Sequence, residues 1–180
     1  VLEVVEADNL VFHGDDLYFN TGSTISKIDV TDQSPAAIDV VTSGLDDIYG
    51  MAFKGDVLFI ADGRFENSME VSDLFKIDVS GSETTPTHVI DGPEAVLQGL
   101  AFYGDGNELH FISSPGFSDH KILKIDVSQI APTTTEVVTN LSDRPENIAF
   151  DGNDLYISFF NKIVKADVTE DSPTTTDVIS

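Results

Sequence analysis

The chain has 180 residues, 41% of them hydrophobic, and its 32 acidic and nine basic side chains give a formal net charge of −23. A chain of this length can bury one hydrophobic core, and the absence of cysteine excludes a disulfide framework, thiolate catalysis and cysteine zinc sites. The negative charge repels phosphate backbones, so we expect no nucleic acid partner. Since no apolar run approaches the roughly 20 residues that cross a bilayer, we expect no membrane insertion.

A two-part motif occurs four times along the chain, always in the same order. Its first part is an apolar run, a turn rich in Gly and Asp and a second apolar run; its second part is Lys-Ile-Asp-Val or, in the last repeat, Lys-Ala-Asp-Val. The first parts begin at Leu10, Met51, Leu100 and Ile148, and the second parts begin at Lys27, Lys76, Lys124 and Lys165. The phenylalanines that end the first apolar runs, Phe12, Phe53, Phe102 and Phe150, lie 41, 49 and 48 residues apart. A period of this size is typical of β-propeller blades.

Each repeat predicts four antiparallel strands, and the last repeat shows them most clearly. Strands at 147–150 and 155–158 flank a tight turn at 151–154, and two further strands follow at 162–168 and 176–180. A proline, which cannot donate to a strand ladder, lies in the connector before each fourth strand. These prolines are Pro35, Pro86, Pro132 and Pro173. The predicted fold is all-β, a β-propeller of four four-stranded antiparallel blades that is either four-bladed or part of a larger propeller.

The repeats divide a single propeller domain, residues 1–180, into modules at about 8–44, 45–95, 96–143 and 144–180. Residues 1–7 resemble the fourth strands of later modules, so we expect an extra outer strand there. Three arrangements fit this count: a four-bladed propeller with a redundant strand, part of a larger propeller, or an open unit that completes itself by association. Because an unpaired sheet edge promotes self-association, a homo-oligomer is one expected state.

Two phrases of the repeat, PENIAFDGNDLYI from Pro145 and KILKIDV from Lys121, resemble blades of NHL-type and gluconolactonase-like six-bladed propellers. They are more similar still to tandem propeller repeats of secreted surface proteins of marine bacteria. The resemblance implies blade architecture and no single function, because propellers serve as hydrolases, lyases, lectins and scaffolds. Thr-rich and Asp-rich connectors, two arginines in all and a start without methionine favour an extracellular or cell-surface location.

The repeated Gly and Asp turns, such as 13–16 and 151–154, indicate residues with a structural role rather than a ligand-binding site. The connections at the opposite edge surround the mouth of the central channel and differ between modules, so a ligand would be recognised there. The second module also carries an inserted loop at 62–73. The ligand-binding candidates from these segments are Asp46, Asp47, Tyr49, Arg64, Glu66, Asn67, Glu70, Gln98 and Arg144.

Carboxylates and amides that converge from several blades are the hard oxygen ligands that Ca²⁺ takes. Gluconolactonase-like enzymes hold a catalytic divalent ion in this way, and the resemblance implies metal ligands at the matching positions Asn9, Gln98, Glu146 and Asn147. The second module has Tyr49 and Gly50 at the equivalent point, so the ligands are fewer than in that family. Ca²⁺ is the one cofactor candidate, and ordinary polar loop residues are the alternative.

No catalytic residue is predicted from the sequence. The histidines His13, His88, His110 and His120 occupy positions typical of structural residues, and the sequence lacks a phosphate-cradling loop, a nucleophile elbow and an HExxH motif. We expect an extracellular, acidic binding or structural interaction module with a protein or carbohydrate ligand, rather than an enzyme. Two alternatives stay open: a divalent-metal-dependent hydrolase of the lactonase or esterase type, and a self-assembling subunit of a surface layer or fibre.

Overall fold

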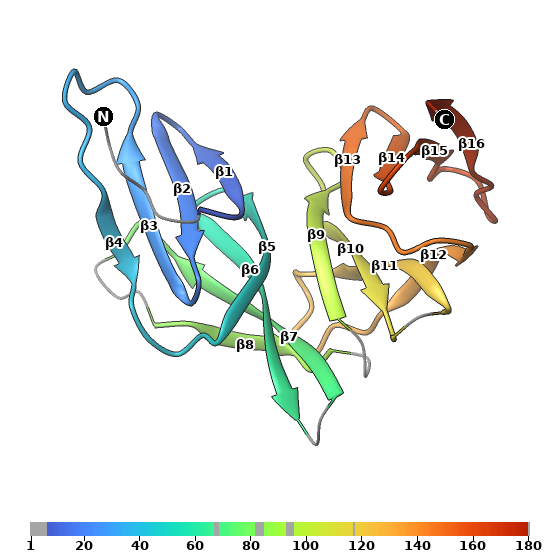
Figure 1. Cartoon of the computed structure of the whole chain (residues 1–180), viewed down its shortest axis with the longest axis horizontal. Helices are drawn as coiled ribbons and strands as arrows, with labels where there is room; N and C mark the ends of the chain where they lie inside the picture. Colours follow the sequence, from blue (N-terminus) through green and yellow to red (C-terminus); the bar gives the residue numbers. More distant parts are fainter. Residues whose placement is uncertain (1–6, 67–68, 82–84, 93–95, 117, 180) are drawn as a thin grey trace.

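The computed structural model describes residues 7–66, 69–81, 85–92, 96–116 and 118–179 (Figure 1). In these residues sixteen strands form four antiparallel four-stranded sheets, each with its strands in chain order. Blade 1 contains β1 (Leu10–His13), β2 (Asp16–Thr21), β3 (Thr24–Asp29) and β4 (Ile38–Val41). Blade 2 contains β5 (Asp47–Lys54), β6 (Val57–Glu66), β7 (Met69–Asp78) and β8 (Thr87–Ile90). Blade 3 contains β9 (Val96–Phe102), β10 (Glu108–Ser114), β11 (His120–Asp126) and β12 (Thr135–Leu141). Blade 4 contains β13 (Asn147–Asp151), β14 (Asp154–Ser158), β15 (Ile163–Asp167) and β16 (Thr176–Ile179).

The predicted all-β propeller of four four-stranded antiparallel blades is confirmed. Among the residues that the structure describes there is no helix, and hence none long and apolar enough to cross a membrane.

The first hairpin of each blade depends on a glycine in the left-handed region. In blade 1 the pair His13↔Asp16 leaves a two-residue turn, and the φ of Gly14 is 60°. The equivalent Gly55 and Gly152 have φ values of 55° and 58°. Two-residue hairpin turns of this kind require positive φ, which L residues with a side chain adopt only at a cost. The repeated turn residues therefore have a structural role, as the sequence predicts.

The Lys-Ile-Asp-Val phrase ends the third strand of each blade. In blade 1 the Asp29 carboxylate accepts hydrogen bonds from the Thr31 hydroxyl at 2.6 Å and the Thr31 N–H at 2.8 Å. These donors lower the pKa of Asp29 below its ordinary value. The same two bonds join Asp78 to Ser80, Asp126 to Ser128 and Asp167 to Thr169. The phrase is thus a local device that turns the chain from the third strand into the connector.

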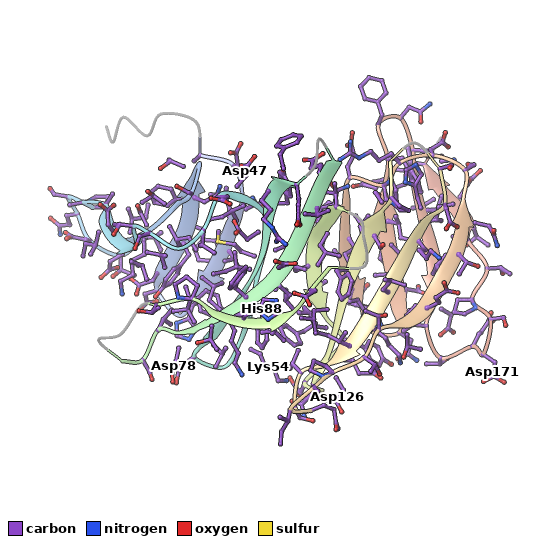
Figure 2. All side chains as sticks on the ribbon, turned by 90° about the horizontal axis from the view of Figure 1, so that it is seen from below. Asp47, Lys54, Asp78, His88, Asp126 and Asp171 are labelled. Atoms are coloured by element: carbon purple, nitrogen blue, oxygen red, sulfur yellow. The ribbon has the colours of Figure 1, made fainter. Side chains whose placement is uncertain are left out.

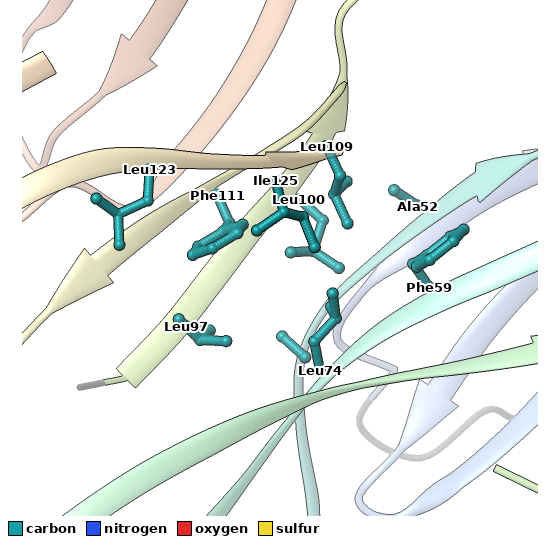
Figure 3. Close-up of a cluster of buried hydrophobic side chains, with 10 residues drawn as sticks. Ala52, Phe59, Leu74, Leu97, Leu100, Leu109, Phe111, Leu123 and Ile125 are labelled. Carbon is teal, nitrogen blue, oxygen red and sulfur yellow. The ribbon is translucent and has the colours of Figure 1, made fainter. Parts of the chain in front are cut away.

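Hydrophobic cores lie between consecutive blades. We call the side chains of a blade that point toward the preceding blade its backward face, and those that point toward the following blade its forward face. Between blades 2 and 3, the forward-face residues Phe59 and Leu74 meet the backward-face residues Leu100, Leu109 and Phe111 (Figure 3). Equivalent cores join blades 1 and 2 and blades 3 and 4. Each side chain buried fully in this way contributes about 1.5 to 3 kcal/mol.

The four inner strands, β1, β5, β9 and β13, surround an axial cavity of about 480 Å³. Its polar lining residues are Asp8, Asn9 and Asn147. The strands approach closely where they lack side chains: a Cβ on Gly50 would lie 3.2 Å from the backbone N of Gly99.

Blades 1 and 4 stand apart on the two sides of the axis (Figure 1), and among the described residues no extensive contact joins them. The predicted extra outer strand at 1–7 lies almost wholly outside the described residues, which begin at position 7.

Candidate functional site

The two edges of the blades carry different residues. Asp47 lies on one edge of the molecule, and Lys54, Asp78 and Asp126 lie on the opposite edge (Figure 2). We call the first of these the mouth face. Its connections include β2–β3, β4–β5, β6–β7, β10–β11, β12–β13 and β14–β15, since each strand reverses the direction of the one before.

The inserted segment of blade 2 extends a hairpin, whereas the sequence predicts a loop at 62–73. β6 and β7 stay paired from Asp62↔Asp73 to Glu66↔Met69. The predicted ligand residues Arg64, Glu66 and Glu70 therefore sit on a strand ladder above the sheet, and Asn67 lies outside the described residues. Residues on a ladder are better fixed than residues on a free loop, because each is held by strand pairing.

Tyr49 is packed against this hairpin. A Cβ on Gly63 would lie 2.0 Å from the Tyr49 ring, so the ring fills the place where a side chain would stand. The Tyr49 hydroxyl donates a hydrogen bond to Glu70 Oε1. Burial, together with this carboxylate, raises the pKa of Tyr49. Tyr49 and Glu70 are thus brought together as a pair that ties β5 to the extended hairpin.

Asp62 is a buried carboxylate of the mouth face, with 6% of its surface exposed. Its Oδ1 accepts hydrogen bonds from the N–H groups of Asp46 at 2.9 Å and Asp47 at 3.0 Å. Burial raises the pKa of Asp62 to about 6. The predicted ligand residues Asp46 and Asp47 are exposed, and their backbone is positioned by Asp62. The sequence signal for Asp62 is an acidic residue directly after the apolar run Leu58 to Ala61.

Arg64 is held by acidic neighbours. Its Nη1 donates to Asp73 Oδ2, and its Nη2 lies 3.4 Å from Glu66 Oε2. Asp73 also accepts the Gly92 N–H at 3.1 Å, and it forms a cluster with His88 and Asp91 whose ligand atoms lie within 4.8 Å of one another. His88 Nε2 and Asp91 Oδ1 are 3.1 Å apart. The polar atoms of this cluster therefore satisfy one another and Arg64.

A second group of predicted residues lies between blades 3 and 4. Gln98, Arg144 and Glu146 line a pocket of about 570 Å³ on the mouth face. Gln98 Nε2 donates to the Pro145 carbonyl at 2.6 Å, and Arg144 Nη2 lies 3.4 Å from Gln98 Oε1. The rest of the lining is Asp143, Pro145, Phe159, Phe160 and Asn161.

The β14–β15 connection gives this pocket its aromatic wall. Lys162 Nζ lies 2.7 Å from Asp143 Oδ2 and 4.9 Å from the centre of the buried Phe159 ring. Phe160, by contrast, is 92% exposed. Phe160 was not among the predicted site residues, although the phrase Phe-Phe-Asn at 159–161 has no counterpart in the other repeats.

The four metal candidates line two different cavities. Asn9 and Asn147 line the axial cavity, and Gln98 and Glu146 line the pocket between blades 3 and 4. The Asn9 amide nitrogen donates to Asn20 Oδ1 at 3.1 Å and to the Ile48 carbonyl at 3.0 Å. Asn147 Oδ1 accepts the N–H of Ile148 at 2.9 Å. The Asn9 amide therefore ties the start of blade 1 to β5, whereas the Asn147 contact is local to β13.

The buried histidines lie in blade 3. His110 packs edge-on against the Phe150 ring, with centroids 4.9 Å apart, and burial lowers its pKa to about 4. His120 is also buried, and burial lowers its pKa. Both imidazoles are therefore neutral at neutral pH, and His110 occupies the core position that Tyr18 and Phe59 hold in blades 1 and 2.

Comparison with known proteins supports the fold. No family model and no curated protein matches the chain. Among solved structures, one from a nidogen/laminin complex aligns with a TM-score of 0.75 and 12% identity, over 97% of this chain and 65% of that chain. The protein YjhT aligns with a TM-score of 0.67 and 9% identity, over 94% of this chain and 63% of that chain. A TolB protein from Agrobacterium tumefaciens aligns with a TM-score of 0.65 and 16% identity, over 93% of this chain and 58% of that chain.

These neighbours are β-propeller proteins, and the chain spans less than two thirds of their length, between 58% and 65%. The likeness to NHL-type and gluconolactonase-like propellers stays a prediction. The chain has the β-propeller fold, with a mouth face that carries a polar cluster on blade 2 and an aromatic-walled pocket between blades 3 and 4.

Proposed function

We propose that this chain is a protein-interaction module that binds its partner through the mouth face. The observation that carries the proposal is the position of its two arginines. Arg64 directly precedes Phe65, which is 78% exposed, and Arg144 shares a pocket with Phe160, which is 92% exposed. Arginine and aromatic side chains dominate the residues that carry binding energy in protein interfaces.

The pocket between blades 3 and 4 is the centre of the proposed surface. It combines one apolar anchor, Phe160, with a guanidinium at Arg144 and a carboxylate at Glu146. Such a site suits a partner segment that presents an apolar side chain flanked by polar groups of both signs. The high negative charge would speed association with a basic partner and would make that rate depend on salt.

The similarity to a propeller from a nidogen/laminin complex supports a protein partner in preference to a carbohydrate. It is a likeness of fold, so the partner itself is not transferred. Another aligned structure is the extracellular domain of a one-component system from B. thetaiotaomicron. An extracellular location is therefore part of the proposal.

The test is selection of binders from a peptide display library on the immobilised chain. We expect enriched peptides to lose at least about tenfold in affinity for a double variant, Phe160→Ala with Arg144→Ala, because truncation of hot-spot residues costs more than about 1 kcal/mol each. Ile130→Ala is the matched control, since Ile130 is also fully exposed but follows β11 at the opposite edge. Peptides that bind the parent and the double variant equally would refute the proposed surface.

A further inference from the structure

The cores between blades use the same repeat positions each time. On the backward face, Leu58, Leu109 and Leu155 are equivalent residues of blades 2, 3 and 4, and all are 0% exposed. Met51, Leu100 and Ile148 are a second equivalent set, at 8%, 8% and 6% exposure. The backward face is therefore an apolar surface that the preceding blade covers wherever a preceding blade is present.

In blade 1 the inner strand exposes its part of this backward face, whereas Phe19 on β2, at the position of Ile60, is buried with 5% exposure. Leu10 and Phe12, equivalent to Met51 and Phe53, are 64% and 61% exposed. Among the described residues, none from blade 4 makes an extensive contact with this blade. Two large apolar side chains on one four-residue strand are therefore in water, at positions that the other three blades bury or half-bury.

Blade 4 exposes an apolar residue on its forward face. Ile163 pairs with Ile179 across β15 and β16, as Ile25 pairs with Val41 in blade 1. Ile25 and Val41 are 0% and 1% exposed, whereas Ile179 is 60% exposed. Among the described residues, each copy thus exposes apolar side chains on the backward face of blade 1 and on the forward face of blade 4, the two kinds of surface that pack together inside the chain.

We propose that the backward face of blade 1 binds the forward face of blade 4 of a second copy of this chain. The contact repeats the geometry of the interfaces between blades 1 and 2, 2 and 3, and 3 and 4. It joins two different surfaces, so it is a head-to-tail contact, which closes into a ring or extends into a filament according to the rotation between copies. It uses neither the mouth face nor the pocket between blades 3 and 4.

A polar contact lies beside each core within the chain. In the first hairpin turn, His13 Nε2 lies 3.1 Å from Asp56 Oδ1 of the next blade. At the equivalent positions, Lys54 donates to the Asp105 carbonyl, and the Tyr103 hydroxyl donates to Asn153 Oδ1 at 2.7 Å. A residue able to donate thus faces the turn residue of the following blade each time.

Blade 4 breaks this pattern, because its equivalent residue is Asp151. In the contact between copies Asp151 would face Asp15 of blade 1, which is equivalent to Asp56, Asp105 and Asn153. Two carboxylates at this point repel each other, and a net charge of −23 per copy adds to the repulsion. The association is therefore weak at low salt and becomes stronger as salt screens the charges.

The experiment is sedimentation equilibrium of the full chain at concentrations up to about 1 mM, the range in which contacts worth about 4 kcal/mol are populated, at low and at high salt. We expect concentration-dependent oligomers that increase with salt. Asp151→Lys should tighten the dissociation constant by about tenfold, since it replaces a repulsion with an attraction. The matched control Asp171→Lys makes the same change of net charge at another exposed site of blade 4.

The apolar arm of the test is the double variant Leu10→Ser with Phe12→Ser. Both side chains are already exposed, so this variant should fold as the parent does, which circular dichroism checks. It should weaken the association by more than about tenfold through lost apolar burial. The inference is wrong if the parent and Asp151→Lys stay monomeric throughout, if Asp171→Lys tightens the contact as much as Asp151→Lys does, or if the serine variant associates like the parent.

Discussion

Replacing Asp62 with Asn should stabilise the propeller at neutral pH. The Asp62 carboxylate is buried beneath the mouth face and accepts the N–H groups of Asp46 and Asp47. The Oδ1 of Asn can accept both bonds, so the variant keeps the positioning of this turn. It removes the charge that burial makes unfavourable, which is why the pKa of Asp62 is about 6.

The size and sign of the effect follow from the pKa. An ordinary value of 3.8 in the unfolded chain and about 6 in the folded chain correspond to about 3 kcal/mol, since one pKa unit is about 1.4 kcal/mol. The folded state holds the proton more tightly, so Asp62 contributes most below pH 3.8, and its contribution is lost as pH rises through 6. Between about pH 4.5 and pH 8, the advantage of the Asn variant should grow by about 2 kcal/mol.

The assay is urea unfolding of parent and variant, followed by circular dichroism across this pH range. Asp171→Asn is the control, because it removes one charge from an exposed position and reports the general effect of lowering the net charge. A difference in unfolding free energy between parent and Asp62→Asn that does not change with pH would refute the reasoning. An equal gain in Asp171→Asn would show that the burial of Asp62 is not the cause.

Two further substitutions test the packing around His110 and around Tyr49. His110→Phe should reduce the loss of stability in acid by up to about 3 kcal/mol at pH 4.5. The folded chain keeps His110 neutral down to about pH 4, whereas the unfolded chain protonates it near pH 6.5. The contribution of His110 to the free energy of unfolding therefore falls as the pH falls through this window. Urea unfolding at pH 4.5 and pH 8 measures this, and an unchanged pH dependence would contradict it. Gly63→Ala should cost about 1 to 3 kcal/mol and alter the near-ultraviolet tyrosine signal, because its Cβ meets the Tyr49 ring. Gly55→Ala, whose Cβ meets open space at a φ of 55°, should cost about 1 to 2 kcal/mol and leave that signal unchanged.

The fold could be predicted from the sequence because its determinants are local. The turn at Gly14 and the Asp29 to Thr31 contact involve residues one to three positions apart; the turn recurs in blades 2 and 4, and the contact recurs in every repeat. Because these local signals repeat at a nearly constant spacing, the spacing predicts the blade architecture.

The candidate site was harder to predict from the sequence, because its contacts join residues far apart in the chain. Gln98 and Pro145 come together only when blade 4 packs on blade 3. The segment at 62–73 suggested a loop because it interrupts the repeat, yet strand pairing continues to Glu66↔Met69. Asp62 illustrates the same limit, since its partners Asp46 and Asp47 precede it by a whole hairpin.

Each hydrophobic core of this chain belongs to two consecutive blades. The stability of a blade is therefore set mainly by its immediate neighbours, as in a linear repeat array. Blade 2 can dock on blade 1 before the later residues are made, so the chain is suited to fold progressively from its first blade during synthesis. Losing blade 4 would open a single core and leave the other two intact. In evolutionary terms, such a construction can gain or lose whole blades without redesigning those that remain.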